Sequence, residues 1–457
     1  MKVEELCHQL WPEKSRHIGQ QFRKLFRRKK NVSQGPTKTF QIERLEGGSF
    51  NRIIGVAIND SDKSKFVLRI PRFEFARPAR DAAILRYVRQ RYPQIPVPEI
   101  EAADFTSHNV LNEPYMVQKR IPGIGLHSKE CRFPGLTHDQ KHTFAAQFGK
   151  ILRSLMSVKN EEPGQIEGIA IFGSAQAKRQ VPCFRVRPFD VDADLTRCNP
   201  DLDEMTVSGE QPKYESHLEF FLTQFGRYKA AAMKRNAIAE AEYMAAFASL
   251  AIQLDQSGFL GQDARYVLCH LDLNMSPHNI MVKIDDKANL SITGILDWDS
   301  AVLLPTFAAC QPPMWVWAWD KEEPEDERAA GLTPLSPEMQ ELKAIFEDAV
   351  GDEWLKYRYQ PGFRIARKLC DFAINGLTSP QKMEEANDLI KEWASMRPEG
   401  MEEVLEPRKS DNIWILNDDF DQGLDLPKPA NPEIYPQTVS TSKQDLSVEL
   451  KLAFQID

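Results

Sequence analysis

Acidic, amide and imidazole side chains gather between residues 267 and 300, where three short apolar runs end in polar residues. The runs Tyr266–Cys269, Ile280–Ile284 and Ile292–Leu296 are typical of buried strands. The polar residues that interrupt them are His270, Asp272, Asn274, His278, Asn279, Asp297 and Asp299. A turn over Asp285–Asn289 would pair the second and third runs as a hairpin and bring Asn279 and Asp297 to one end. Carboxylate and amide oxygens at strand ends suit a hard cation and a phosphate, so this segment predicts a site for both.

The order of these residues resembles the catalytic core of the aminoglycoside phosphotransferase-like family, within the protein-kinase-like superfamily. The kinase pattern is His-x-Asp, an Asn about five positions later, and a strand-end Asp in Asp-Phe-Gly. His270–Asp272 supplies the first part, and Asp297–Asp299 is similar to the family's Asp-Trp-Glu version of the last. The loop is longer than the pattern, so either it bulges and Asn279 keeps the role, or Asn274 has taken it. We favour Asn279, because an apolar strand follows it directly.

The resemblance implies ATP-dependent phosphorylation of a hydroxyl group on a small-molecule acceptor. Asp272 would orient that hydroxyl and take its proton. Asn279 and Asp297 would hold Mg²⁺, and Asp299 would bind a second ion or support the first. His270 would be structural and would fix the loop through hydrogen bonds. The identity of the acceptor does not follow from the family, because one fold serves many substrates.

The segments that would position the nucleotide begin with three predicted antiparallel strands, Phe40–Leu45, Arg52–Ile58 and Lys65–Ile70. A Gly-Gly turn joins the first two strands. It is not Gly-x-Gly-x-x-Gly, and alone it indicates only a hairpin, but it resembles the glycine loop of fungal-type members of the family. The phosphate-binding residues implied by this resemblance are Gly47, Gly48 and Ser49.

The third strand presents Arg69 where kinases carry a phosphate-binding lysine. Arginine stays cationic and can hold a phosphate through two parallel hydrogen bonds, so ATP binding is physically reasonable. A helix is predicted over Arg77–Tyr92. In it Asp81 matches the family's acid that pairs with the strand cation, and Glu74 is the fallback.

A further strand and the hinge between the lobes are predicted over Tyr115–Gly123. The resemblance implies that backbone groups here hold the adenine, with Gln118 and Arg120 as the candidates. From Thr137 onward the pattern becomes helical. The predicted helices are His138–Val158, Tyr214–Ser257, Pro337–Val350, Gly362–Leu377 and Pro380–Met396.

Residues 160–212 have an irregular pattern. The resemblance implies that an inserted helical section, here residues 160–257, helps to form the acceptor pocket. Trp315, Trp317 and Trp319 have two interpretations. They would wall such a pocket against an amine or an aromatic ring, or they would pack in the core.

These elements predict an α+β, bilobal protein-kinase-like fold, with a small antiparallel β lobe plus one helix and a larger α-rich lobe. The predicted divisions are a helical extension over 1–36, the small lobe over 37–122, the large lobe over 123–397 with an insertion over 160–257, and an acidic, Pro-rich tail over 398–457.

Composition narrows the class of protein. The formal charge of −8 argues against a dedicated nucleic-acid binder, and no apolar run is long enough to span a membrane. Seven scattered cysteines without Cys-x-x-Cys, and a start without an apolar signal core, predict a cytoplasmic protein. The basic run 23–30 is either an import or anionic-surface signal or, more commonly, a solvated helix end. The oligomeric state cannot be predicted.

Two other functions fit parts of the pattern. A metal-dependent hydrolase would use His270, Asp272, His278, Asp297 and Asp299 as ligands, but it does not predict the kinase order of elements over Glu43–Phe307. A kinase-like scaffold with weak chemistry is consistent with Arg69, Asp81 and the lengthened loop. A protein kinase is disfavoured, because no Ala-Pro-Glu follows Asp297.

Overall fold

The structure is a computed structural model of the 457-residue chain. It describes residues 2–12, 38–45, 50–59, 64–72, 78–129, 131–169, 183–189, 214–261, 265–273, 277–318 and 327–396. The chain divides into two compact units, residues 1–408 and 409–457. All described residues belong to the first unit, and the basic run 23–30 and the predicted tail 398–457 lie outside them.

The first group of elements is a five-stranded antiparallel sheet with the strand order β1-β2-β3-β5-β4. Its strands are β1 (Phe40–Arg44), β2 (Asn51–Ile58), β3 (Lys65–Pro71), β4 (Ile100–Asp104) and β5 (Tyr115–Lys119). The three strands predicted at the start of this region are confirmed. Consecutive short strands pair as hairpins here because turns separate them and one face is apolar.

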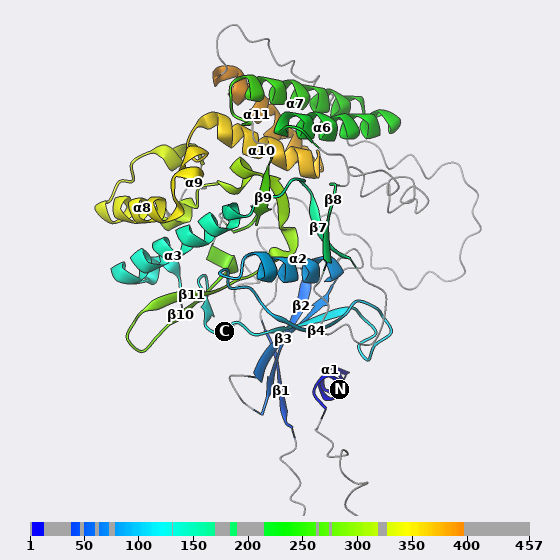
Figure 1. The fold of residues 1–457 in the computed structure, drawn as a ribbon, viewed down its shortest axis with the longest axis vertical. Coiled ribbons are helices and arrows are strands. Elements are labelled where there is room, and N and C mark those ends of the chain that lie inside the picture. Colours follow the sequence, from blue (N-terminus) through cyan, green and yellow to red (C-terminus); the bar gives the residue numbers. More distant parts are fainter. Residues whose placement is uncertain are drawn as a thin grey trace, which may run out of the picture. The chain divides into compact units, whose positions relative to one another are not determined.

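The two faces of this sheet have different roles. Phe66, Leu68 and Ile70 of β3 are buried in a cluster with Leu6 and Cys7 of α1 (Lys2–Leu10). Side chains alternate along a strand, so Arg69 extends from the opposite face. That is the side of α2 (Pro78–Arg91), which lies between the sheet and the helices of the larger lobe (Figure 1).

The larger lobe contains two hydrophobic clusters separated by a two-stranded ribbon. The ribbon pairs β9 (Tyr266–Cys269) with β12 (Val302–Pro305), and every residue in both strands is buried. Leu268 packs into the cluster that contains α3 and α8, whereas Val267 packs into the cluster of α6, α7, α10 and α11. A strand buried on both faces needs a continuous apolar run, which is what β9 has.

The helices of this lobe pack against the ribbon in two groups, which lie above and to the left of β9 in Figure 1. They are α3 (His138–Ser157), α6 (His217–Lys234), α7 (Ile238–Gln256), α8 (Pro337–Val350), α9 (Asp352–Lys356), α10 (Pro361–Asn375) and α11 (Pro380–Met396). The region Tyr214–Ser257, predicted to be helical, contains two helices, α6 and α7. Asn236 adopts φ 60°, a left-handed conformation that ends α6 before α7 begins.

A β-hairpin occupies part of the region predicted to be irregular. Strands β7 (Gln165–Ile169) and β8 (Cys183–Arg187) pair antiparallel and lie against α2. Tyr87 of α2 contacts the edge of the Phe184 ring, with centroids 5.4 Å apart, and its hydroxyl donates to Asn160 Oδ1 at 2.9 Å. The hairpin and the segment before it therefore hold α2 from the side of the larger lobe.

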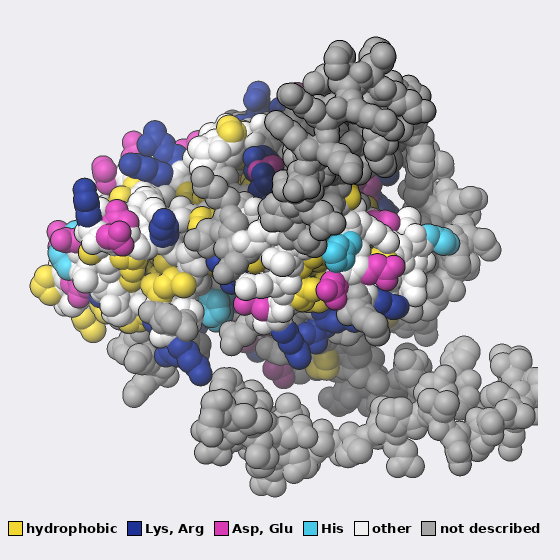
Figure 2. Space-filling view, turned by 90° about the horizontal axis from the view of Figure 1, so that it is seen from below, with side chains coloured by type: hydrophobic (Ala, Val, Ile, Leu, Met, Phe, Trp, Pro, Cys, Tyr) yellow, Lys and Arg dark blue, Asp and Glu magenta, His cyan; other side chains and the backbone are white. Residues whose placement is uncertain are grey.

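The two-layer small lobe and helical large lobe confirm the predicted α+β architecture. Basic and acidic side chains are interspersed on the face that Figure 2 shows. Among the described residues, the helices are too short or too polar to cross a membrane.

Candidate active site

The hairpin of β10 (Ile280–Ile284) and β11 (Leu290–Ile295) brings Asn279 and Asp297 to the same end. Ile280 is paired with Ile295, and the Leu296 N–H donates to the Asn279 carbonyl at 2.8 Å. The turn is held by Asp285, whose Oδ1 accepts from the Asn289 N–H at 2.9 Å. An Asx turn of this kind fixes the register of a short hairpin. The predicted pairing of these two runs is therefore present.

His270 anchors the loop that follows β9 to the segment that follows β11. Its side chain is 7% exposed, its Nε2 lies 2.8 Å from the Leu296 carbonyl, and its ring meets the edge of Trp298 at 4.8 Å. Burial lowers the pKa of His270, so the ring is neutral and Nε2 carries the proton that bonds Leu296. This arrangement agrees with the structural role predicted for His270.

Asp272 lies at the surface of this loop, next to the turn after Asp297. The Ser300 hydroxyl donates to Asp272 Oδ2 at 3.2 Å. The charge of Asp272 is also close enough to contribute to the pKa of Asp297. Ser300 was not among the predicted site residues, although its place directly after Asp297–Asp299 would have been a signal. Asn274, the alternative to Asn279, lies outside the described residues.

Asp297 adopts φ 62°, a left-handed conformation that is uncommon for a residue other than glycine. Part of its side chain reaches solvent. The pKa of Asp297 is nevertheless raised, first because surrounding protein atoms remove water from it and then because the Asp299 carboxylate is near. A strained backbone and a nearby like charge both cost free energy, and a folded chain keeps them only where other interactions offset that cost. Such positions are common in functional sites.

The predicted partner of Arg69 is replaced by another acid. Arg69 Nη2 bonds Asp299 Oδ2 at 2.7 Å, and the two side chains are 13% and 29% exposed. Among the described residues, the ion pair of Arg69 is with Asp299 and not with Asp81, although the Arg69 charge is near enough to act on the pKa of Asp81. Burial and then the Asp299 charge raise the pKa of Asp81 to about 7, which Arg69 only partly opposes.

The structure describes the two strands that flank the glycine turn but not the turn itself. The Leu45 N–H donates to the Ile53 carbonyl at 3.2 Å, which closes the β1–β2 hairpin around it. Gly47, Gly48, Ser49 and the fallback acid Glu74 lie outside the described residues. Their roles remain predictions.

The predicted hinge residues are already bonded within the sheet. Gln118 is buried and pairs with Val67 of β3 and Ile100 of β4. The Arg120 N–H donates to the Lys65 carbonyl at 2.9 Å, and the Arg120 guanidinium pairs with Glu43. An adenine held here would therefore need main-chain groups other than the N–H of Arg120.

Trp315 and Trp317 pack in the core, which decides between their two interpretations. They are 4% and 2% exposed. Trp315 contacts the Phe133 ring edge-on at 5.3 Å, and Trp317 lies 5.4 Å from the Phe346 ring. Trp319 lies outside the described residues.

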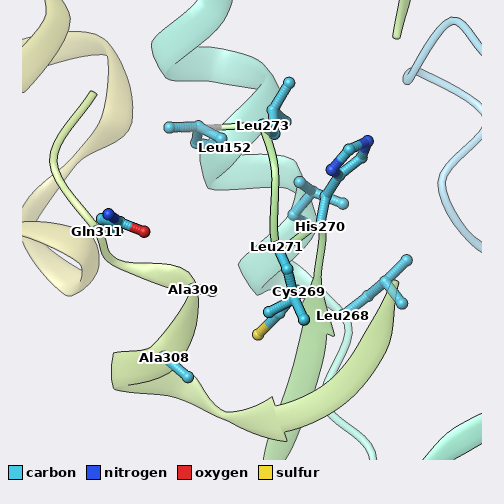
Figure 3. Close-up of a pocket in the computed structure, with 10 residues that line it drawn as sticks. Leu152, Leu268, Cys269, His270, Leu271, Leu273, Ala308, Ala309 and Gln311 are labelled. Carbon is cyan, nitrogen blue, oxygen red and sulfur yellow. The ribbon is translucent and has the colours of Figure 1, made fainter. Parts of the chain in front are cut away.

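A small pocket lies beneath the loop that carries Asp272 (Figure 3). Its lining residues are Leu152, Leu155, Leu268, Cys269, His270, Leu271, Leu273, Ala308, Ala309 and Gln311. Burial raises the pKa of the Cys269 thiol, so the thiol stays neutral. These lining residues include no carboxylate, so the pocket lacks the acid oxygens that a hard cation would need.

One family model and several solved structures are similar to this chain. Residues 41–344 match the model of the phosphotransferase enzyme family, APH. No curated protein matches the sequence. One similar solved structure is the macrolide 2'-phosphotransferase MphH from Brachybacterium faecium, with 15% identity, 76% of this chain and 91% of that chain covered, and a TM-score of 0.36. Another is a candidate fructosamine-3-kinase from Thermobifida fusca YX-ER1, with 12% identity, 77% and 93% covered, and a TM-score of 0.38.

The family resemblance carried by the His270–Asp272 and Asp297–Asp299 motifs is thus confirmed, while membership of a fungal-type branch stays a prediction. The matched region begins in β1 and continues into α8, so it includes every described residue of the acid-rich site. Because this match spans more than half of its length, the chain belongs to the phosphotransferase enzyme family.

Proposed function

We propose that this phosphotransferase moves a phosphoryl group from ATP to a hydroxyl group of a small molecule. The observation that carries the proposal is the grouping of Asp272, Asp297 and Asp299 with Asn279 at one end of the β10–β11 hairpin, beside the cation Arg69. Acids, an amide and one guanidinium are the donors needed to hold a metal–phosphate group and to accept a proton. A cytoplasmic location is part of the proposal.

The donor set fits Mg²⁺. Asn279, Asp297 and Asp299 offer only oxygen ligands, which Mg²⁺ prefers. Burial and then the Asp299 charge raise the pKa of Asp297, and a divalent cation at that position would relieve the like charge. These three residues would hold the ion. When bound, the Mg²⁺–ATP complex supplies the transferable phosphoryl group and neutralises the charge on its oxygens.

Each protein group then has a task that its surroundings support. Asp272 is exposed and accepts the Ser300 hydroxyl, so it is placed to orient an acceptor hydroxyl and take its proton. Arg69 forms an ion pair with Asp299 and would fix the orientation of this ion ligand. Alternatively, Arg69 would bind a phosphate oxygen of the nucleotide. His270 keeps the two loop segments together. Catalysis would come mainly from positioning and charge neutralisation.

The test is ATP turnover by the full chain with a panel of small hydroxylated acceptors, comparing the wild type with Asp272→Asn. This change keeps the shape of the side chain and its contact with Ser300 but removes the base. We expect the turnover rate to fall about 10²-fold or more with little change in nucleotide affinity. An unchanged rate would contradict the role of Asp272.

A catalytically weak binding protein is the second candidate, and one contact favours it. Arg69 is bonded to Asp299, and the helix acid expected to position it, Asp81, is unpaired with it among the described residues. Nucleotide binding without turnover on any acceptor would support this candidate. The metal-dependent hydrolase is disfavoured, because His270 is buried with its Nε2 bonded to a carbonyl.

A further inference from the structure

Two histidines and a glutamate from different helices face one another on the surface of the larger lobe. His138 and His142 are four residues apart at the start of α3, so they lie on one face of the helix. Glu341 comes from the second turn of α8, which packs along α3. One ligand atom from each of the three residues lies within 4.8 Å of the other two.

The spacing of these atoms matches the edges of a metal coordination shell. His138 Nε2 and His142 Nε2 each lie 3.5 Å from Glu341 Oε2. Ligands at the usual zinc distances in a tetrahedral arrangement are separated by about 3.3 Å. The two N···O separations are close to this value, so an ion between the three groups would need only small movements of the exposed His138 and Glu341 side chains and of the partly buried His142.

The same separations are poor for direct hydrogen bonds, which have N···O distances of about 2.9 Å. His142 Nε2 is buried and, among the described residues, has no hydrogen-bond partner. A buried nitrogen without a partner is unfavourable, and an ion would provide that partner.

The charges around the three residues leave Glu341 available. The neighbouring acid on α8, Glu338, pairs with Lys141 Nζ at 2.7 Å. Lys141 is therefore paired with an acid other than Glu341, and Glu338 is also close enough to His138 and His142 for their charges to act on its pKa. One carboxylate and two imidazoles remain facing one another.

We propose that His138, His142 and Glu341 bind a divalent transition-metal ion of the Zn²⁺ class. Imidazole together with a single carboxylate selects Zn²⁺, Co²⁺ or Ni²⁺ over Mg²⁺, which prefers oxygen ligands alone. The three protein ligands leave a fourth position for water. An ion bound here links the start of α3 to α8. This site shares no residue with the proposed active site, and its existence does not depend on phosphotransfer.

The proposal is tested by titrating the full chain with Zn²⁺ by calorimetry and with Co²⁺ by visible absorption, which reports four-coordinate Co²⁺. We expect one ion per chain. We expect affinity at least about ten-fold weaker in His142→Ala and in Glu341→Gln, since loss of even an outer partner of a metal ligand costs that much. Matched controls are His108→Ala, an exposed histidine elsewhere, and Asp297→Asn in the proposed active site.

Two outcomes would overturn the proposal: no Zn²⁺ binding by the wild type, or binding that His142→Ala and Glu341→Gln leave unchanged. Binding lost in Asp297→Asn and kept in His142→Ala would also overturn it, because the ion would then lie among the carboxylates. Metal-free circular dichroism shows whether each variant is folded. If His142→Ala fails to fold, Glu341→Gln decides the question, because Glu341 is 53% exposed.

Discussion

The molecule carries two groups of polar side chains, each with residues proposed to hold an ion, that differ in their donor atoms and in the elements that position them. We call Asp272, Asn279, Asp297 and Asp299 the strand-end cluster, and His138, His142 and Glu341 the helix trio. The strand-end cluster has only oxygen donors, which lie where strands stop and turns begin. The helix trio has two ring nitrogens and one carboxylate, placed by helical spacing and by contact between two helices.

If both proposed sites bind ions, the difference in their donor atoms would keep two classes of ion apart. In the strand-end cluster like charges accumulate, the pKa of Asp297 rises, and Arg69 offsets part of the charge through Asp299. Such a group favours a hard cation that arrives with phosphates. The helix trio has one acid and rings that bind a metal when neutral, so it favours a borderline ion without phosphates. Donor chemistry, rather than net charge, separates the two.

The largest predicted effect is a loss of phosphotransfer that leaves zinc binding at the helix trio unchanged. Asp297→Asn removes a charge from the strand-end cluster while keeping its shape. Because a proposed ion ligand is lost, we expect phosphotransfer to fall about 10²-fold or more. Zn²⁺ affinity at the helix trio should be unchanged. Turnover assays and zinc calorimetry on the same preparation measure both. A rate close to that of the wild type would remove Asp297 from the proposed ion site.

The next effect concerns the charge balance of the strand-end cluster. The pKa of Asp81 is raised to about 7, so the folded state binds a proton that the unfolded state has lost. Stability therefore falls as the pH rises from about 4 to about 7 and levels off above that. Asp81→Asn removes this dependence. We expect the melting temperature of the variant to exceed that of the wild type by a margin that grows from pH 5 to pH 7.

Thermal unfolding of Asp81→Asn and wild type at several pH values measures this margin. A margin that does not depend on pH would show that Asp81 is not desolvated beside Asp299. Asp139→Asn is a matched control, because Asp139 is an exposed acid in the first turn of a different helix.

The smallest predicted effect concerns a hydrogen bond between α2, which carries Asp81, and the segment after α3, which carries the histidines. Tyr87 of α2, the helix of Asp81, bonds Asn160, which follows the end of α3, the helix of the histidines. Tyr87→Phe removes this hydrogen bond and keeps the contact of the ring with Phe184. We expect a loss of about 1 kcal/mol in the free energy of unfolding, measured by urea denaturation, and no change in Zn²⁺ affinity. A wild-type midpoint would mean that water replaces the bond without cost.

The parts of the fold that sequence could predict are those with local patterns. The alternation in Lys65–Ile70 and the apolar run Tyr266–Cys269 predicted strands, because burial imposes a period of two or a continuous run. The meeting of Asn279 and Asp297 followed from one hairpin between them. These contacts join residues close in the chain, so few arrangements compete.

The parts that sequence could not predict depend on distant contacts. Whether Arg69 pairs with Asp81 or with Asp299 depends on how the small lobe packs against the β10–β11 hairpin. Both candidates are aspartates, so the sequence cannot distinguish them. Glu341 meets His138 only because α8 packs along α3. The β7–β8 hairpin was missed because a long intervening segment separates its strands and no tight turn marks the pairing.

The ribbon of β9 and β12 has a consequence for substrate choice. Leu268 and Val267, adjacent in β9, are held by different layers of helices, so the loop that leads to Asp272 starts from a strand that neither layer can move alone. If Asp272 is the base, its position is then fixed by β9. A change of acceptor would come from changes in the other segments that line the acceptor site. Variants with altered substrates should then carry substitutions in the predicted insertion, residues 160–257, and not in β9.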